Sequence, residues 1–276
     1  MDFREEYKLL IKSSIKQDDN ILADKKKAAL QHFRGNLNAY CIALAKNYGK
    51  TFILYVAPVR QIHGSFLVCF PYSNCIDIFV DPEFLKKNPA YINVILQHEV
   101  LHGLSQEKNL DQFSFGHSVR ENYKNYVGVD EAVTQMFAED IQGVRLSSKE
   151  DYLLYVKNMM RILKSIFGAE LIAAQYIKGD LTFENTVNKL MDYKFEAFAI
   201  KMKEVYTLWK KEFYSFLTQE EIIKKENIEH DINVFISSLI KKCPIENLNN
   251  ILYQELDQEF IDRYKDKIGI LTERIV

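Results

Sequence analysis

Two histidines four residues apart, inside an otherwise apolar run, constrain this chain more than any other feature. The run reads Ile95-Leu96-Gln97-His98-Glu99-Val100-Leu101-His102-Gly103-Leu104, and no proline interrupts it. A helix is its natural conformation, and residues four apart then share one face, so both imidazoles can point at the same place. Apolar residues lie on nearly every side of this helix, which predicts that the helix is central and buried.

Burying these two imidazoles costs free energy unless their nitrogens bind a partner inside the protein. A buried His-Glu-His group loses its hydration, and a bound metal ion offsets that loss. The pattern H-E-x-x-H is a zinc metalloprotease signature, in which both histidines bind the metal and the glutamate is a general base. Glu99 lies about 100° round the helix from His98, close enough to act on a water at the metal. The alternative is a chance match in which the core simply satisfies both histidines.

Composition and charge limit the other classes of protein. The chain has 276 residues, of which 47% are hydrophobic, enough for one large domain or two small ones with a proper core. A formal net charge of -2 gives no electrostatic footprint for nucleic acid, so no nucleic-acid partner is expected. Only ten glycines and five prolines favour helices over a turn-rich all-β fold.

The N-terminal residues and the hydropathy pattern bear on localisation. The N-terminus is charged and lacks the features of a signal peptide, and no run of about 18 apolar residues predicts a transmembrane helix. We therefore expect a cytoplasmic protein without a membrane partner. A chain whose export signal had been removed would give the same pattern.

The four cysteines do not form a recognisable metal or disulfide framework. They are Cys41, Cys69, Cys75 and Cys243, with no C-x-x-C pair among them. Cys69 and Cys75 flank a predicted turn and could bridge in an oxidising compartment, but free thiols are the favoured interpretation.

The order of hydrophobic patterns predicts an α+β fold with three parts. Residues 1–50 read as N-terminal helices, residues 51–145 as a core of strands and two helices, and residues 146–276 as a large helical C-terminal subdomain. We expect the strands to form a small, mostly antiparallel sheet. The expected elements are helices 3–17 and 20–48, strands Thr51–Ala57, Ser65–Phe70 and Cys75–Val80, and helices at about 89–106 and 129–144.

Two stripes in the C-terminal part are expected to be core rather than ligand sites. Aromatic and apolar residues at helical spacing are far more often buried packing than a cofactor box. The first stripe comprises Phe195, Phe198, Met202, Val205, Trp209, Phe213 and Phe216, and the second comprises Ile228, Ile232, Phe235 and Leu239.

A catalytic zinc needs a third protein ligand and an open position for water. The metzincin pattern is excluded, because Ser105 and Lys108 stand where that pattern needs glycine and histidine. His117 is possible, but it lies in a polar, irregular stretch rather than on a rigid element.

Glu131 is the favoured third ligand. On a helix it shares one side with Thr134 and Gln135, and a polar stripe that faces inward needs a partner such as a metal with its surroundings. The competing interpretation is that Asp130 and Glu131 only favour the N-terminus of the helix through its dipole.

The two segments H-E-V-L-H and D-E-A-V-T-Q together resemble the gluzincin class of zinc metallopeptidases. That class includes thermolysin-like enzymes and aminopeptidases related to leukotriene hydrolase, and the resemblance covers about residues 75–144. It implies a zincin-like catalytic core with Zn²⁺ as cofactor, ligands His98, His102 and Glu131, and Glu99 as general base. The substrate that it implies is a peptide or protein.

Two positions depart from the gluzincin pattern. Asp130 stands where asparagine is common, and Gln135 stands where an aspartate often orients a zinc histidine. An amide can accept that N–H bond, but it raises imidazole basicity less than a carboxylate does. The class also places a strand before the active-site helix whose edge binds extended peptide, and Cys75–Val80 matches that position. An ordinary sheet strand would have the same sequence.

The resemblance also implies a donor for the developing oxyanion. Some gluzincin toxins supply a tyrosine a few residues before the ligand glutamate, and Tyr126 and Tyr123 lie five and eight residues before Glu131. His117 and Arg120 are nearby alternatives.

These observations favour zinc-dependent peptide-bond hydrolysis by metal-activated water, with Glu99 as general base. Two alternatives stay open. One is a non-catalytic zinc-binding or regulatory protein that keeps the gluzincin shape, and the other is a helical scaffold with a chance motif.

Overall fold

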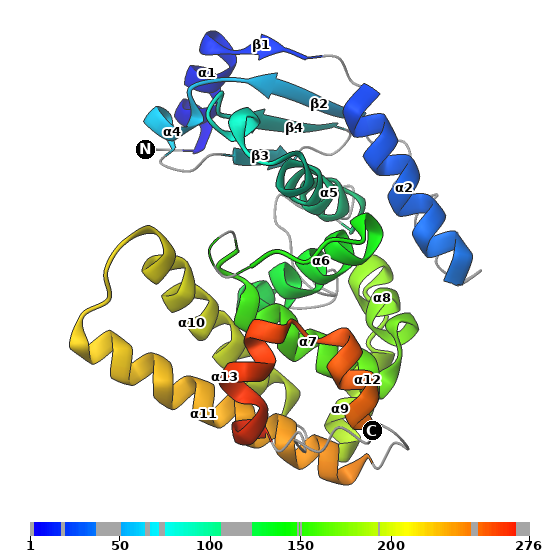
Figure 1. The fold of residues 1–276 in the computed structure, drawn as a ribbon. Helices are drawn as coiled ribbons and strands as arrows, with labels where there is room; N and C mark the ends of the chain where they lie inside the picture. The colour runs from blue at the N-terminus through cyan, green and yellow to red at the C-terminus, as the bar shows by residue number, and fades with distance from the viewer. Residues whose placement is uncertain are drawn as a thin grey trace. The chain divides into compact units, whose positions relative to one another are not determined.

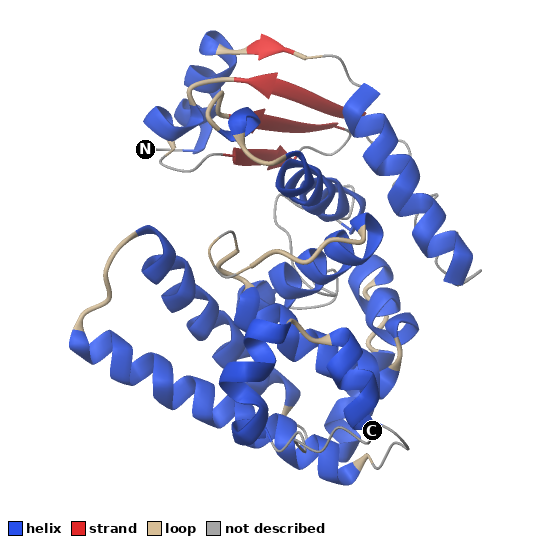
Figure 2. Cartoon of the chain, viewed as in Figure 1, coloured by secondary structure: helices blue, strands red, loops and turns tan. Residues whose placement is uncertain are grey.

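The computed structural model describes residues 3–17, 20–36, 51–63, 67–71, 75–105, 123–147, 149, 151–192, 194–243 and 248–268. The chain forms two units. The first comprises Met1–Phe113 with Phe137–Val144, and the second comprises Ser114–Met136 with Arg145–Val276. The described strands all lie in the first unit, and the described part of the second unit is helical (Figure 2).

The sheet of the first unit is mixed rather than mostly antiparallel. Its strands run in the order β1 (Ile15–Lys16), β2 (Thr51–Val56), β4 (Cys75–Val80), β3 (Leu67–Pro71). The two outer pairings are antiparallel, but the long central pairing of β2 with β4 is parallel. The expectation erred because α4 (Val59–Ile62) and β3 intervene between β2 and β4, so that β4 returns in the direction of β2.

Strand β4 lies inside the sheet, which corrects the expectation that its edge receives a substrate. Residues of β4 pair with β2 on one side and with β3 on the other. Its backbone N–H and C=O groups are therefore used within the sheet, and a peptide cannot add to it. The strand at that end of the sheet, among the described residues, is β3.

One face of the sheet carries an apolar cluster beneath α1 (Phe3–Ser13) and α4. The buried residues of this cluster are Leu10, Ala57, Val59, Phe70 and Phe79. Helix α1 is shorter than the expected 3–17, because the hydroxyls of Ser13 and Ser14 bond carbonyl oxygens of the preceding turn. The chain then pairs Ile15 with Val56 of β2.

The opposite face of the sheet packs against α5 (Pro89–Ser105), as Figure 1 shows. A β-carbon added at Gly103 would collide with the side chains of Ile76 and Phe52. Only glycine therefore allows this approach. Helices α2 (Asn20–Asn36) and η1 (Phe84–Lys86) complete the first unit's described elements, together with the end of α6 (Val127–Gln142). The part of the expected helix 20–48 beyond residue 36 lies outside the described residues.

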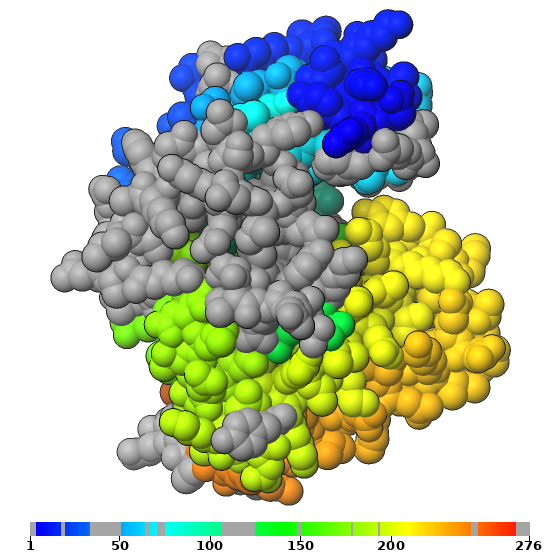
Figure 3. Space-filling model, turned by 180° about the vertical axis from the view of Figure 1, so that it is seen from behind, coloured from blue at the N-terminus to red at the C-terminus, as the bar shows by residue number. Residues whose placement is uncertain are grey.

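The second unit is a packed set of helices. Its elements are η3 (Tyr123–Tyr126), the start of α6, α7 (Leu154–Phe167), α8 (Ala169–Lys178), α9 (Thr182–Leu190), α10 (Phe195–Tyr214), α11 (Gln219–Lys242), α12 (Leu248–Glu255) and α13 (Gln258–Ile268). Atoms of α10 and α11, coloured yellow to orange, lie on an outer face of this unit (Figure 3). Among the described residues, no helix is both long and apolar enough to span a membrane.

The expected core stripes are confirmed for most of their length. Residues from Phe195 to Trp209 in the first stripe are buried, and so are Ile228, Ile232 and Leu239 in the second, whereas Phe235 is only half-buried. The expectation is wrong at the end of the first stripe, where Phe213 is 39% exposed and Phe216 is 96% exposed. Helix α10 ends at Tyr214, so the helical spacing no longer applies to Phe216, whereas Phe213 lies in the last turn of the helix.

A buried carboxylate joins α11 to α10 and α13. Glu229 accepts hydrogen bonds from the indole N–H of Trp209 at 2.8 Å and from the hydroxyl of Tyr264 at 3.2 Å. Burial raises the pKa of Glu229, although these hydrogen bonds and the nearby Lys225 ammonium oppose that change. The ionised form of this carboxyl is therefore less stable in the folded chain than in water.

Candidate metal centre

The helix α5 that carries the H-E-x-x-H residues begins and ends where its sequence predicts. The side chain of Asn88 accepts a hydrogen bond from the backbone N–H of Ala90, at 2.9 Å, and Pro89 occupies the first helical position. The helix is buried on most sides, as expected, and the histidines share in that burial. His98 is 6% exposed and His102 is 3% exposed.

The two imidazoles converge on one point. Their Nε2 atoms lie 2.9 Å apart, and the ring planes meet at 78°. Two bare nitrogens this close would repel each other, so a proton or a cation must lie between them. Two imidazoles on one tetrahedral zinc place their nitrogens about 3.3 Å apart, which this arrangement needs little movement to reach.

Glu131 brings a third ligand atom to the histidines. Ligand atoms of His98, His102 and Glu131 all lie within 4.8 Å of one another. Two nitrogens and one carboxylate oxygen form a donor set that catalytic zinc uses. Two buried imidazoles and one half-buried carboxylate that converge in this way fit a metal ion, and the sequence predicted all three residues.

The far end of α6 explains how this helix is held beside α5. Phe137 packs edge-on against Phe33 of α2, with ring centroids 5.4 Å apart. The amide of Gln142 donates a hydrogen bond to the side-chain oxygen of Gln97 on α5, at 3.1 Å. These contacts hold the last turns of α6 against α2 and α5 within the first unit.

The polar stripe beside Glu131 is satisfied in part by α8, within the second unit. The hydroxyl of Thr134 donates to the carbonyl oxygen of Asp130 and lies 2.8 Å from the hydroxyl of Tyr176 on α8. Asp130 and Gln135 are both buried in α6. Thr134 is therefore held by protein groups, whereas Glu131 joins the histidine cluster.

Glu99 projects from the side of α5 that meets the sheet. It lies one turn before Gly103, where an added β-carbon would collide with Ile76 of β4. Cys69 of β3 pairs with Ile78 of β4, so its side chain is on the same face of the sheet as Ile76. The Cys69 thiol donates a hydrogen bond to Glu99.

The thiol that meets Glu99 stays protonated. Desolvation of the sulfur, the negative charge of Glu99 and the hydrogen bond between them all raise the pKa of Cys69. The register of β3 places Cys69 opposite Ile78, away from Cys75, and the described cysteines Cys69, Cys75 and Cys243 are free thiols, as expected.

The structure describes the side chain of only one of the residues expected to donate to the oxyanion. The buried Tyr126 hydroxyl donates to a carboxylate oxygen of Glu184 at 3.3 Å, which gives this side chain a partner inside the second unit. Tyr123 starts the short helix η3, but its side chain lies outside the described residues, as do His117 and Arg120. A catalytic role for any of them stays a prediction.

Two tyrosines that the sequence did not single out lie near Glu131. Burial, and then the charge of Glu131, raise the pKa of Tyr206 on α10, while a hydrogen bond from Tyr152 acts in the opposite direction. The pKa of Tyr152 is raised by burial, by Tyr206 and by Glu131. Both hydroxyls are therefore protonated donors. Their proximity to Glu131 could not be predicted from the sequence, because the residues around each tyrosine are those of an ordinary core helix.

Comparisons with protein-family models, with curated proteins and with solved structures gave no significant match for this chain.

Proposed function

We propose that this chain is a zinc-dependent peptidase. The convergence of His98, His102 and Glu131, with ligand atoms within 4.8 Å of one another, carries the proposal. Zinc bound by these three residues would polarise a peptide carbonyl and lower the pKa of a water molecule. This donor set, with a glutamate directly after the first histidine, is what metal-assisted hydrolysis requires.

Glu99 is the general base in this proposal. It follows the first histidine by one residue, so it is close to the cluster without belonging to it. Its carboxylate accepts a proton from the attacking water and then passes the proton to the leaving amine. The hydrogen bond from Cys69 is compatible with this role, because it holds one side of the carboxylate in place.

The substrate is a peptide bound in extended form along β3. This strand lies at the end of the sheet, and its Cys69 contacts the general base. A peptide that pairs with β3 through backbone hydrogen bonds would therefore pass close to Glu99. The proposal moves the substrate strand from β4 to β3, because both sides of β4 are already paired.

Tyr206 is a candidate for the oxyanion donor. It is buried, protonated and close enough to Glu131 to sense its charge. Tyr152 donates a hydrogen bond to the Tyr206 oxygen, which leaves the proton of Tyr206 available for an acceptor on the substrate.

Substitution Glu99→Gln tests the function. Glu99 is not a ligand, so the variant keeps its zinc, but loss of the base lowers peptide cleavage by about 10²-fold or more. The assay is digestion of a broad peptide library, read by mass spectrometry at matched zinc content. Glu170→Gln, which changes an exposed glutamate on α8, is the matched control and keeps full activity.

Two outcomes of this assay contradict the proposal. Equal cleavage by wild type and Glu99→Gln would show that Glu99 is not the base. Zinc-loaded wild type without any cleavage would instead favour a zinc-binding or regulatory protein that does not turn over substrate.

A further inference from the structure

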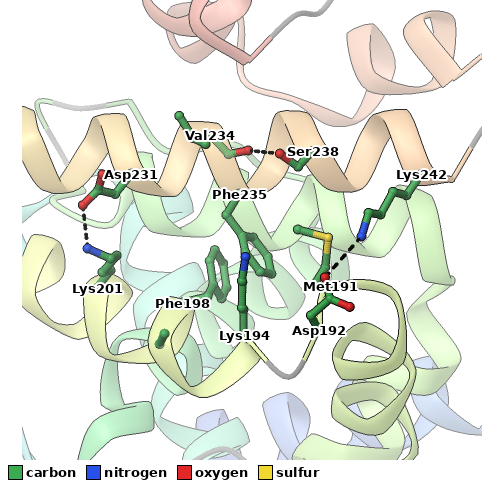
Figure 4. Close-up of a pocket in the computed structure, with 11 residues that line it drawn as sticks. Met191, Asp192, Lys194, Phe198, Lys201, Asp231, Val234, Phe235, Ser238 and Lys242 are labelled. Atoms are coloured by element: carbon green, nitrogen blue, oxygen red, sulfur yellow. Dashed lines mark hydrogen bonds and ion pairs between the residues drawn. The ribbon is translucent and has the colours of Figure 1, made fainter.

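A second site lies in the second unit, apart from the residues of the metal cluster. Helices α10 and α11 and the turn that follows α9 line an open pocket of about 520 Å³ (Figure 4). This volume is within the range of pockets that bind small molecules. None of its lining residues takes part in the proposed hydrolysis.

The floor of this pocket is aromatic and apolar. Phe198 of α10 and Phe235 of α11 stack with ring centroids 4.7 Å apart and planes at 22°. Met191 and Val234 extend the apolar lining, and Val234 is 51% exposed although it is apolar. A ligand with an apolar body would cover this surface and remove it from water.

The rim of the pocket has one positive charge in excess. Lys201 pairs with Asp231 at 2.6 Å. Lys242 donates to the carbonyl oxygen of Leu190 at 2.6 Å and lies 3.8 Å from the carboxylate of Asp192.

Lys194 is the remaining lysine of the rim. Its ammonium makes no hydrogen bond or ion pair with any residue in the described part of the chain, and only its backbone carbonyl is bonded, to the N–H of Phe198. In Figure 4 its side chain extends from the start of α10 into the space between the two helices. The two acids of the rim are matched by Lys201 and Lys242, so Lys194 is the group that can receive an anion.

We propose that this pocket binds a small amphipathic monoanion, a carboxylate on an apolar body. The body lies on Phe198 and Phe235, and the carboxylate accepts a charge-assisted hydrogen bond from the ammonium of Lys194. A cationic amphiphile is repelled by the same lysine, and a neutral one loses the hydrogen bond. A preference for the anion therefore distinguishes a specific binding site from an apolar surface that binds any amphiphile.

The test compares three probes that share one apolar body. Decanoate, decanol and decyltrimethylammonium are titrated separately into the full-length protein by calorimetry. We expect decanoate to bind one site, decanol to bind about tenfold more weakly or worse, and the cation not to bind. In Lys194→Gln, decanoate binding weakens about tenfold, whereas Lys189→Gln, an exposed lysine on α9 outside the pocket, binds as wild type does.

The position of bound decanoate is determined independently by NMR of methionine methyl groups. The chain has six methionines, and Met191 lines the pocket. With ¹³C-methyl methionine, decanoate shifts the Met191 resonance, assigned from Met191→Leu, and leaves those of the buried α7 residues Met159 and Met160 in place.

Three results would overturn the proposal. They are absence of decanoate binding, equal binding of all three probes, and unchanged decanoate affinity in Lys194→Gln. Equal binding would identify an apolar docking surface without charge preference. None of these readouts depends on bound metal or on peptidase activity, so the outcome is independent of the proposed function.

Discussion

Replacing Gly128 with alanine tests how closely the start of α6 packs against α10. A β-carbon on Gly128 would lie 2.5 Å from both the carbonyl carbon and the carbonyl oxygen of Met202, and 2.6 Å from the amide nitrogen of Lys203. All three are backbone atoms, so no side-chain rotation relieves the collision. The two helices must separate by about 1 Å to restore ordinary van der Waals contact.

The expected cost follows from two opposing effects. Overpacking of this kind costs about 1–3 kcal/mol. Alanine gains at most about 1 kcal/mol over glycine within a helix, and less near a helix end, where Gly128 lies. We therefore expect Gly128→Ala to lower the free energy of unfolding by about 1–2 kcal/mol, as measured by urea denaturation.

A second glycine provides the matched control. Gly143 follows α6 with a φ of 64°, and a β-carbon there meets no atom within 4 Å. Asparagine tolerates this left-handed conformation, so Gly143→Asn changes the free energy of unfolding by less than about 0.5 kcal/mol. If Gly128→Ala proved as stable as wild type, the close approach of α6 and α10 would be wrong.

Three further predictions concern the metal ligands, the oxyanion donor and pH. Glu131→Ala weakens zinc affinity by about tenfold or more, measured by competition with a chelator, and Asp130→Ala has a smaller effect because Asp130 is not in the cluster. Tyr206→Phe lowers kcat for peptide cleavage by about 10²-fold at unchanged zinc content. If Tyr126 is the donor instead, that loss appears in Tyr126→Phe. The raised pKa of Glu229 means that the folded chain holds this proton more tightly than the unfolded chain. The free energy of unfolding therefore falls as pH rises from about the ordinary glutamate pKa of 4.5, and Glu229→Gln flattens that decline in urea denaturation. An unchanged decline in the variant would assign the pH dependence to other groups.

The pairing of the two candidate histidine ligands was predictable because their geometry is local. A spacing of four residues on one helix brings His98 and His102 together whatever surrounds them. Glu131 was predictable for a different reason, since its polar stripe on an otherwise buried helix called for a partner. The structure adds the distance that joins it to the histidines.

The pairing of strands and the neighbours of Glu131 were not predictable in the same way. Nothing within Cys75–Val80 indicates that β2 takes one side of it and β3 the other, because partners are chosen across the fold. Tyr206 is 75 residues beyond Glu131, next to Val205 of the stripe that the sequence assigns to the core. Phe216 shows the opposite error. Its spacing matches the predicted core stripe, but the helix ends before it and its side chain is exposed.

Zinc K-edge X-ray absorption of the zinc-loaded protein tests the central claim most directly. We predict one zinc per chain with two imidazole nitrogens and oxygen ligands at about 2.0–2.2 Å, and no sulfur shell. Substitution His98→Ala should abolish this spectrum. A protein that takes up no zinc, or a zinc–sulfur distance of about 2.3 Å that would indicate cysteine ligands, would contradict the account.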